Sequence, residues 1–250
     1  FLRKAGWLRF FPPLADLVDC PQDPQWHPEG DVWTHTLHCM DAFARRRTGD
    51  REEDLVVGLA VLCHDFGKAR TTARVDGRIR SPGHEKAGLE PAQRFMEQLN
   101  VSRKIQEAVL PLIHCHMRPS LLYQQSSSAS AIRRLARDCG RLDRLLRVAE
   151  ADAAGRPPMP GNAAHVTDWI RRRARELEVE QQAPAPLITG KDLLERGWES
   201  GPAIGEFLRA AYERQLDGLF QDRPEALAWL DRQLGERLRS PGTQASEPEA

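Results

Sequence analysis

The strongest constraint on the fold is a helix-length segment, residues 52–66, that is apolar almost all the way round. A helix of this kind is stable only when it is buried inside a domain. The segment ends with the adjacent pair His64-Asp65, and we expect Gly67 to end the helix. Because an imidazole and a carboxylate are costly to bury without partners, the sequence predicts that a buried partner, such as a cation, meets this pair.

Helical periodicity continues along most of the chain, whereas no segment shows a convincing strand alternation. Asp31 is a suitable N-cap for the helix that follows it. Residues 69–84 are compatible with a small hairpin or a loop, and Pro111 with a kink or a helix start. The expected helices are 32–47, 52–66, 85–99, 102–114, 131–138, 141–154, 164–180, 191–195, 202–219 and 224–238. The predicted fold class is therefore all-α.

The composition is that of an ordinary globular protein. Apolar residues make up 40% and charged residues 29%, and the formal net charge is zero, so the total charge indicates no partner. The longest apolar stretch, residues 55–63, is too short to span a bilayer, and no secretory signal is present. Five scattered cysteines without a CxxC pair indicate a reducing compartment, and we assign them to core packing rather than to a disulfide framework or a thiolate zinc site. We therefore expect a cytoplasmic protein with no membrane segment, and its first residue, Phe1, suggests a piece of something longer.

Two further residues can complete a metal site around His64 and Asp65. His35 lies in the middle of the preceding helix, and Asp152 lies in a later one. Side chains from three helices would then project into one bundle core, as in helical metalloproteins. Imidazole nitrogens with carboxylate oxygens suit divalent ions such as Mg, Mn, Fe, Co, Ni or Zn. A single histidine on a helix is more often a core or surface residue, and His38 is assigned to that class, but the combination favours a divalent-metal site.

Two more histidine clusters follow, one at His84 and one at His114 and His116. With them, the order His…His-Asp…Asp resembles the signature of the HD superfamily of metal-dependent phosphohydrolases. The surrounding sequence is more similar still to the HD-containing branch of bacterial CCA-adding enzymes, which are tRNA nucleotidyltransferases related to poly(A) polymerases. The matching stretches are 22–24, 26–36, 62–68, 83–85, 116–119, 150–152 and 187–193.

The resemblance implies an HD-domain helical bundle followed by a C-terminal helical arm. The chain then divides into a leading segment, an HD domain, the arm and a disordered tail, at residues 1–30, 31–160, 161–240 and 241–250. The nucleotidyltransferase head of such enzymes carries a Gly-Ser pair and an Asp-x-Asp metal site, and nothing in this sequence matches it. We therefore expect that the chain does not add CCA by itself, and that a head either lies upstream in a full-length protein or never existed.

The resemblance also implies an activity, the hydrolysis of 2′,3′-cyclic phosphates, 2′-nucleotides or other small phosphomonoesters at a bound cation. By family position the first metal would be held by His35, His64, Asp65 and Asp152. His84 and His116 would either contribute to a second cation or face the substrate phosphate, and His114 is the weaker candidate. Glu29 could orient a ligand histidine.

Two positively charged side chains follow the expected ligands closely. Lys68 lies three residues after Asp65, and Arg118 lies two residues after His116. A point charge and a bidentate guanidinium are both suited to holding a phosphate over a metal. The alternative interpretation of each is a solvated surface cation.

Arginines outnumber acidic residues between positions 129 and 175. On one continuous helix, several of them would share a face, although we expect Gly140 to interrupt it. Such a strip can follow an RNA backbone, and the alternative is a solvated arginine-rich face. The residues predicted to bind RNA are Arg133, Arg137, Arg171, Arg172 and Arg173.

Three interpretations remain open on the sequence. The leading one is an HD phosphohydrolase that acts on RNA-end or nucleotide phosphates. The second is the tRNA-binding portion of a CCA-adding enzyme with little hydrolase activity of its own. The third keeps the metal only as a structural link between helices, and the histidines at positions 84 and 116 argue against it, because a purely structural ion does not require them.

Overall fold

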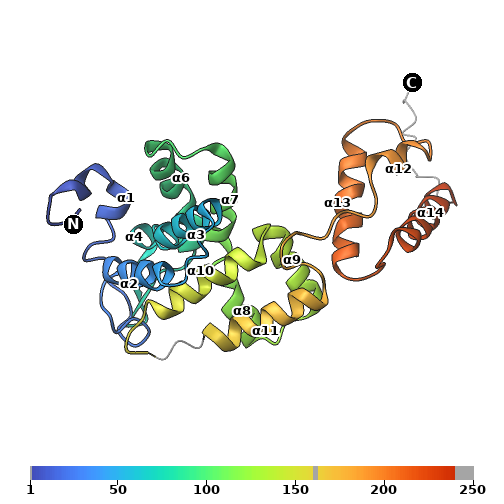
Figure 1. The fold of residues 1–250 in the computed structure, drawn as a ribbon. Helices are drawn as coiled ribbons and strands as arrows, with labels where there is room; N and C mark the ends of the chain where they lie inside the picture. The colour runs from blue at the N-terminus through green and yellow to red at the C-terminus, as the bar shows by residue number, and fades with distance from the viewer. Residues whose placement is uncertain (1, 160–162, 240–250) are drawn as a thin grey trace, which may run out of the picture. The chain divides into compact units, whose positions relative to one another are not determined.

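The computed structural model describes residues 2–159 and 163–239, and the side chains of residues 2–159 and 164–234. The tail expected at 241–250 lies outside the described residues. Contacts divide the chain into two compact units, Phe1–Ala183 and Pro184–Ala250 (Figure 1). Within the described helices, none is long and apolar enough to cross a bilayer.

The prediction of an all-α fold is confirmed, because every described element except two short strands is helical. The first unit contains η1 (Trp7–Phe10), α1 (Pro12–Ala15), α2 (Val32–Ala44), α3 (Arg51–Cys63), α4 (Lys68–Thr71), β1 (Ala73–Val75), β2 (Arg78–Arg80), α5 (His84–Ala87), α6 (Leu89–Gln98), α7 (Arg103–Cys115), α8 (Arg118–Gln124), α9 (Ala129–Cys139), α10 (Leu142–Ala154) and α11 (Ala163–Glu176). The second unit contains α12 (Gly190–Leu194), α13 (Pro202–Leu216) and α14 (Arg223–Arg239).

The segment that the sequence left open between a loop and a hairpin is a hairpin. Strands β1 and β2 pair antiparallel, with Ala73 opposite Arg80. The two turn residues, Asp76 and Gly77, both have positive φ, at 50° and 74°. Positive φ at both central positions is typical of the type I′ turn, whose twist matches that of the two strands.

Helix α3 lies at the centre of the first unit and packs against α2, α7 and α10 (Figure 1). Its side chains at Val56, Val57 and Val61 are essentially fully buried, as its apolar sequence predicts. Helix α2 begins where expected, because the Asp31 carboxylate accepts the Thr34 amide at 2.9 Å and caps it. This packing brings together the first turn of α2, where His35 lies rather than in the middle of the helix as expected, the end of α3 and the end of α10, which are the positions of the four predicted metal ligands.

Gly67 has a different role from the expected one. Helix α3 ends earlier, at Cys63, and Gly67 has an ordinary helical φ of −69°. A Cβ atom at Gly67 would lie 2.0 Å from the carbonyl oxygen of His84 and 2.6 Å from the amide nitrogen of Gly88. The backbone of α5 therefore approaches so closely that only glycine fits, and this approach carries His84 towards the end of α3.

The boundary between the two units also differs from the expected one. The sequence placed the arm from residue 161 onwards, whereas α11 packs on α8, α9 and α10 of the first unit, which ends at Ala183. The second unit has a separate apolar core of Ile188, Leu193, Ala211, Phe220, Ala226 and Leu230. Its first helix starts with a capping box, in which Thr189 and Asp192 each satisfy a backbone amide of the other.

Candidate metal centre

Three of the site histidines are fixed in the same tautomer by backbone carbonyls. His64 and His116 are the C-caps of α3 and α7, where carbonyl groups of the last turn lack helical partners. Their Nδ1 atoms donate to the carbonyl oxygens of Val61 and Ile113, each at 2.7 Å. His84 makes the same contact, at 2.8 Å, with the carbonyl three residues before it. Because a carbonyl only accepts, each Nδ1 carries the proton and each Nε2 presents a lone pair, as a metal ligand requires.

His35 Nδ1 contacts a carboxylate in addition to a backbone carbonyl, that of Gly155, whose oxygen lies 3.2 Å away. Its Nδ1 lies 2.8 Å from Glu29 Oε1, which also lies 2.9 Å from Nδ1 of His27. Its Nε2 faces the other way and lies 3.1 Å from Asp152 Oδ1. Burial alone would lower the pKa of His35, but its hydrogen bonds, foremost that with Asp152, raise the pKa well above the usual value. In the metal-free protein a proton therefore occupies the Nε2 position that a cation would take.

Asp65 lies between the histidines. Its Oδ2 is 3.2 Å from Nε2 of His64 and 2.8 Å from Nζ of Lys68, and its Oδ1 is 3.4 Å from Nε2 of His84. Burial would raise the pKa of Asp65, and the nearby charges outweigh it and hold the pKa well below the usual range. Neither carboxylate oxygen receives a well-aligned hydrogen bond, nor does His64 Nε2, although all three atoms are buried. Buried polar atoms without partners are rare, and here they fit the donor set of a divalent cation.

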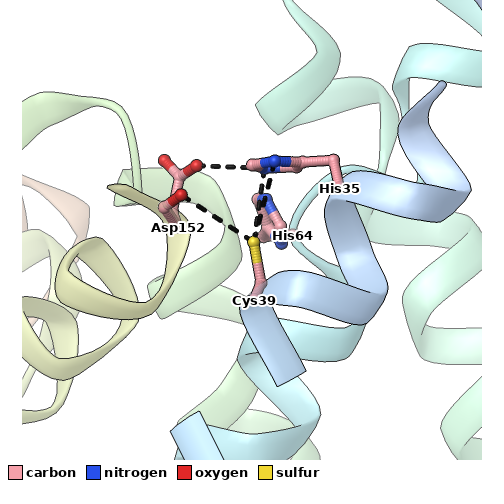
Figure 2. A group of neighbouring side chains, drawn as sticks. All are labelled: His35, Cys39, His64 and Asp152. Atoms are coloured by element: carbon pink, nitrogen blue, oxygen red, sulfur yellow. Dashed lines mark hydrogen bonds and ion pairs between the residues drawn. The ribbon is translucent and has the colours of Figure 1, made fainter. Parts of the chain in front are cut away.

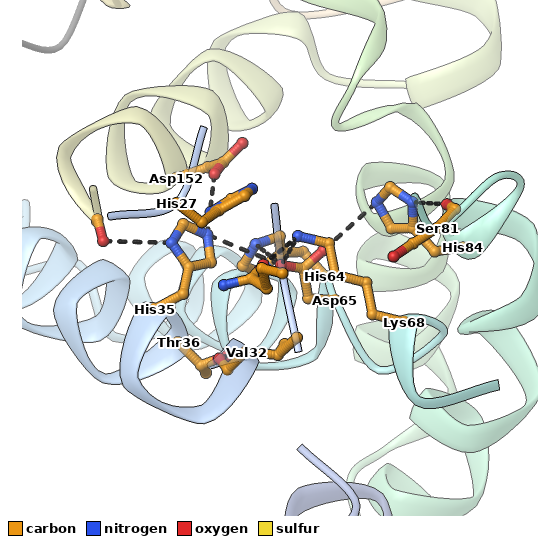
Figure 3. Close-up of polar contacts among 12 residues, drawn as sticks. His27, Val32, His35, Thr36, His64, Asp65, Lys68, Ser81, His84 and Asp152 are labelled. Atoms are coloured by element: carbon orange, nitrogen blue, oxygen red, sulfur yellow. Dashed lines mark hydrogen bonds and ion pairs between the residues drawn. The ribbon is translucent and has the colours of Figure 1, made fainter. Parts of the chain in front are cut away.

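Besides the group of His27, Glu29 and His35, two groups of donor atoms contain the predicted ligands, and the members of each lie within 4.8 Å of one another. The groups are His35, Cys39, His64 and Asp152 (Figure 2), and Asp65, His84 and His116. Figure 3 shows His35 at one side of this arrangement and His84 at the other, with Asp65 and Lys68 between them. All six predicted histidines and aspartates are therefore brought together. Cys39 was not predicted, although its spacing of four residues from His35 on a helix puts both on one face.

His84 and His116 meet directly, with their Nε2 atoms 3.2 Å apart. Burial lowers the pKa of His116 to about 3, so its ring is neutral at ordinary pH. Since both Nδ1 atoms already carry protons, two lone pairs would face each other at this distance. A proton or a cation between the two rings removes this repulsion.

The two predicted phosphate-binding cations differ in position. Lys68 is only 8% exposed, contacts Asp65 and donates to Gln22 Oε1 at 2.7 Å, so it lies inside the site and is no surface cation. Gln22, which the sequence did not single out as a site residue, holds the lysine in place. Arg118 pairs with Asp138 of α9 at 2.5 Å, and the described contacts of Arg118 link α8 to its neighbouring helices.

The basic stretch is largely matched by acidic side chains. Gly140, at a φ of 73°, separates α9 from α10 as expected. Arg144 and Arg147 of α10 bind Glu53 and Asp54 of α3 at 2.5 and 2.7 Å, which joins the two helices. The predicted RNA-binding residues have varied surroundings: Arg133 and Arg137 are half-buried and Arg137 contacts Asp138, Arg171 binds Glu150 and Asp168, Arg172 is exposed, and Arg173 stacks on Trp169.

Comparison with known proteins identifies relatives for most of the chain. Residues 32–154 match the family model described as HD domain. A multifunctional CCA protein from Halorhodospira halophila is 31% identical over 239 residues, which are 92% of this chain and 52% of that protein. One from Laribacter hongkongensis is 34% identical over 165 residues, which are 62% of this chain and 38% of that protein. An A-adding tRNA nucleotidyltransferase from Deinococcus radiodurans is 30% identical over 208 residues, which are 81% of this chain and 46% of that protein.

The chain thus spans about half the length of the curated relatives it matches. No solved structure matches it. The chain carries an HD domain and is homologous, over most of its own length, to the multifunctional CCA proteins.

Proposed function

We propose that the chain is a metal-dependent phosphohydrolase that acts on 2′,3′-cyclic phosphate, 2′-nucleotide or other phosphomonoester ends of RNA or nucleotides. The observation that carries this proposal is a set of buried donor atoms that lack a well-aligned hydrogen bond, His64 Nε2 and both carboxylate oxygens of Asp65, with Lys68 Nζ 2.8 Å from Asp65 Oδ2 as the neighbouring cation. They lie among other histidine and carboxylate donors, so a divalent cation would satisfy them together. The homology to proteins that process tRNA ends supports a substrate that contains a phosphate.

The first cation would be held by His35, His64, Asp65 and Asp152. A bound cation of this kind lowers the pKa of a coordinated water and neutralises charge on a phosphoryl oxygen. The residues of the chain fix the donors: backbone carbonyls set the His64 tautomer, and Glu29 holds His35 from its Nδ1 side.

A second cation position would lie between Asp65, His84 and His116. The facing Nε2 atoms of the two histidines support it, and Asp65 would hold this cation together with them. If this position takes no cation, the same two rings would face the substrate phosphate. Lys68 would change its role when Asp65 binds metal, because its ammonium loses its counter-charge and can attract a phosphate instead.

The test is hydrolysis of 2′,3′-cyclic AMP and p-nitrophenyl phosphate by the purified chain loaded with Mg, Mn, Ni or Co. We expect activity with at least one metal and its loss in Asp65→Ala and His64→Ala. His114→Ala is the matched control and should keep the activity, because His114 is exposed and two residues from His116. Absence of hydrolysis with every metal would falsify the proposal. Counting bound ions per chain in wild type and in His84→Ala distinguishes one cation position from two.

We also propose that tRNA or nucleotide phosphates are the partners of the chain, because its relatives are named for action on tRNA. The exposed guanidinium of Arg172 on α11 is available to a phosphate, and Arg173 follows it, stacked on Trp169. Affinity for tRNA should fall steeply with salt and weaken when residues 171–173 are neutralised. A flat salt response would count against a phosphate-tracking surface.

A further inference from the structure

We propose that Cys39 is a thiolate ligand of the first cation, beside His35, His64 and Asp152. This inference rests on the metal site of the proposed function and changes its chemistry. Cys39 Sγ lies 3.3 Å from His35 Nε2, and all four donor atoms lie within 4.8 Å of one another (Figure 2). Donor atoms around one zinc-sized ion, with bonds of about 2.0–2.3 Å, lie about 3.3–3.6 Å apart in a tetrahedral arrangement. The distance between Cys39 Sγ and His35 Nε2 already lies in this range, and the other donor atoms lie within 4.8 Å.

A second observation points independently to a ligand in this group. His64 is 1% exposed, and its Nε2 atom has no hydrogen-bond partner. Its Nδ1 proton is committed to a backbone carbonyl, so Nε2, which lies 3.2 Å from Asp65 Oδ2 and in one donor group with Cys39 and Asp152, is the nitrogen open to a metal. A thiol and a lone pair without a partner, enclosed together with a carboxylate, are the components of a mixed sulfur, nitrogen and oxygen site.

The sulfur position is fixed by both helices that surround it. Cys39 is fully buried and lies one turn after His35 on α2, so the helix itself directs both donors to the same side. On the other side is the end of α10, where a Cβ at Gly155 would lie 2.2 Å from Sγ and 3.1 Å from the Cys39 amide nitrogen. The glycine lets α10 close over the sulfur and keeps Asp152 beside it.

The other buried cysteines have different surroundings. Cys139 Sγ contacts the carbonyl of Ala136 in its own helix, Cys115 Sγ accepts from Arg118 Nη1, and Cys20 Sγ contacts Thr72 Oγ1, each at 3.9 Å. Within the described residues, Cys39 is the cysteine that shares a donor group with histidine and carboxylate side chains. Cys139 is therefore a matched control: it is a buried thiol, 3% exposed, outside the site.

Ligation by Cys39 changes the metal preference. When the thiol binds a divalent ion, the S–H bond is replaced by an S–metal bond and the proton leaves to solvent, with no change of oxidation state. A thiolate among imidazole and carboxylate donors favours Zn, Co, Ni or Fe over Mg. Removal of the sulfur should weaken Zn or Co binding by at least about tenfold, because mutation of a residue that only orients a metal ligand already lowers metal affinity by about that factor.

The test is an optical titration with Co²⁺ in a thiol-free reductant, on wild type, Cys39→Ala, Cys39→Ser and Cys139→Ala. Visible d–d absorption reports bound cobalt, and a near-ultraviolet sulfur-to-cobalt charge-transfer band reports thiolate ligation. We expect both bands in wild type and Cys139→Ala. Both Cys39 variants should lose the charge-transfer band, keep d–d absorption and bind cobalt more weakly. Circular dichroism checks that each variant is folded, and the wild-type spectrum decides the matter even if neither Cys39 variant folds.

Two results would overturn the inference and leave the metal site standing. One is d–d absorption in wild type without a charge-transfer band, and the other is a charge-transfer band that survives in Cys39→Ala. If no chain binds cobalt at all, both the inference and the metal site of the proposed function fail.

Discussion

The buried ion pair between Asp65 and Lys68 gives a quantitative prediction for the metal-free protein. Asp65 is 1% and Lys68 8% exposed, and the charged atoms lie 2.8 Å apart. The variant Asp65→Asn keeps the shape of the side chain and removes its charge. It leaves the Lys68 ammonium buried, with the neutral amide oxygen of Gln22 as its described hydrogen-bond acceptor.

The magnitude follows from this geometry. At an effective dielectric constant of about 20, two unit charges at 2.8 Å attract by about 6 kcal/mol. Desolvation of both ions offsets part of this attraction in the intact pair. Removing one partner leaves the other ion buried and unpaired, which typically costs about 3–5 kcal/mol. We therefore expect Asp65→Asn to lower the free energy of unfolding of the chelator-treated protein by about 3–5 kcal/mol.

The assay is urea unfolding with a chelator present, on Asp65→Asn, Lys68→Met and the double variant. The double variant should recover most of the loss, because it contains no unpaired charge. The control is Lys104→Met, which breaks an ion pair with Glu52 in which both side chains are at least half exposed, and should cost no more than about 1 kcal/mol. The reasoning is refuted if Asp65→Asn costs no more than this control, or if the two single effects simply add.

Two further predictions concern packing and pH. Gly67→Ala should destabilise the first unit by about 1–3 kcal/mol or more in thermal unfolding and weaken metal binding, because its Cβ would collide with the backbone of α5. The control is Gly205→Ala, whose Cβ would have its nearest contact at 3.5 Å and which should be neutral or stabilising. Equal effects of the two substitutions would contradict the close approach at Gly67. In the second unit, burial would raise the pKa of Asp192, but Arg223 and Thr189 outweigh it and lower the pKa from 3.8 to about 2. A lowered carboxyl pKa stabilises the folded state above the unfolded value, and this stabilisation is lost as pH falls from about 4 to about 2. Asp192→Asn should therefore lose about 1–2 kcal/mol of local stability at pH 7 and match wild type at about pH 2. The measurement is hydrogen exchange of amides 190–234 in the full chain. A difference between variant and wild type that does not change with pH would contradict the lowered pKa of Asp192.

The sequence by itself determined the features that depend on neighbouring residues. The apolar character of α3 predicted its central position, Asp31 predicted the start of α2, and helical spacing predicted an all-α fold. The clustering of His64 and Asp65 with other donor side chains was also predictable, because a buried imidazole and carboxylate need partners. These features follow from local periodicity, capping and the cost of burying charge.

Only the tertiary structure decided how distant segments meet. It placed Cys39 beside His64, although sequence reasoning had assigned the cysteines to packing, and it showed that Glu29, which the sequence offered as a residue that orients a ligand histidine, contacts His35 and His27. It paired Arg118 with Asp138, and it joined α11 to the first unit. Each of these outcomes depends on how closely two helices approach each other and at which register. That approach is set by the packing of whole helix faces rather than by any local sequence pattern, as the close contact of α10 with Cys39 at Gly155 illustrates.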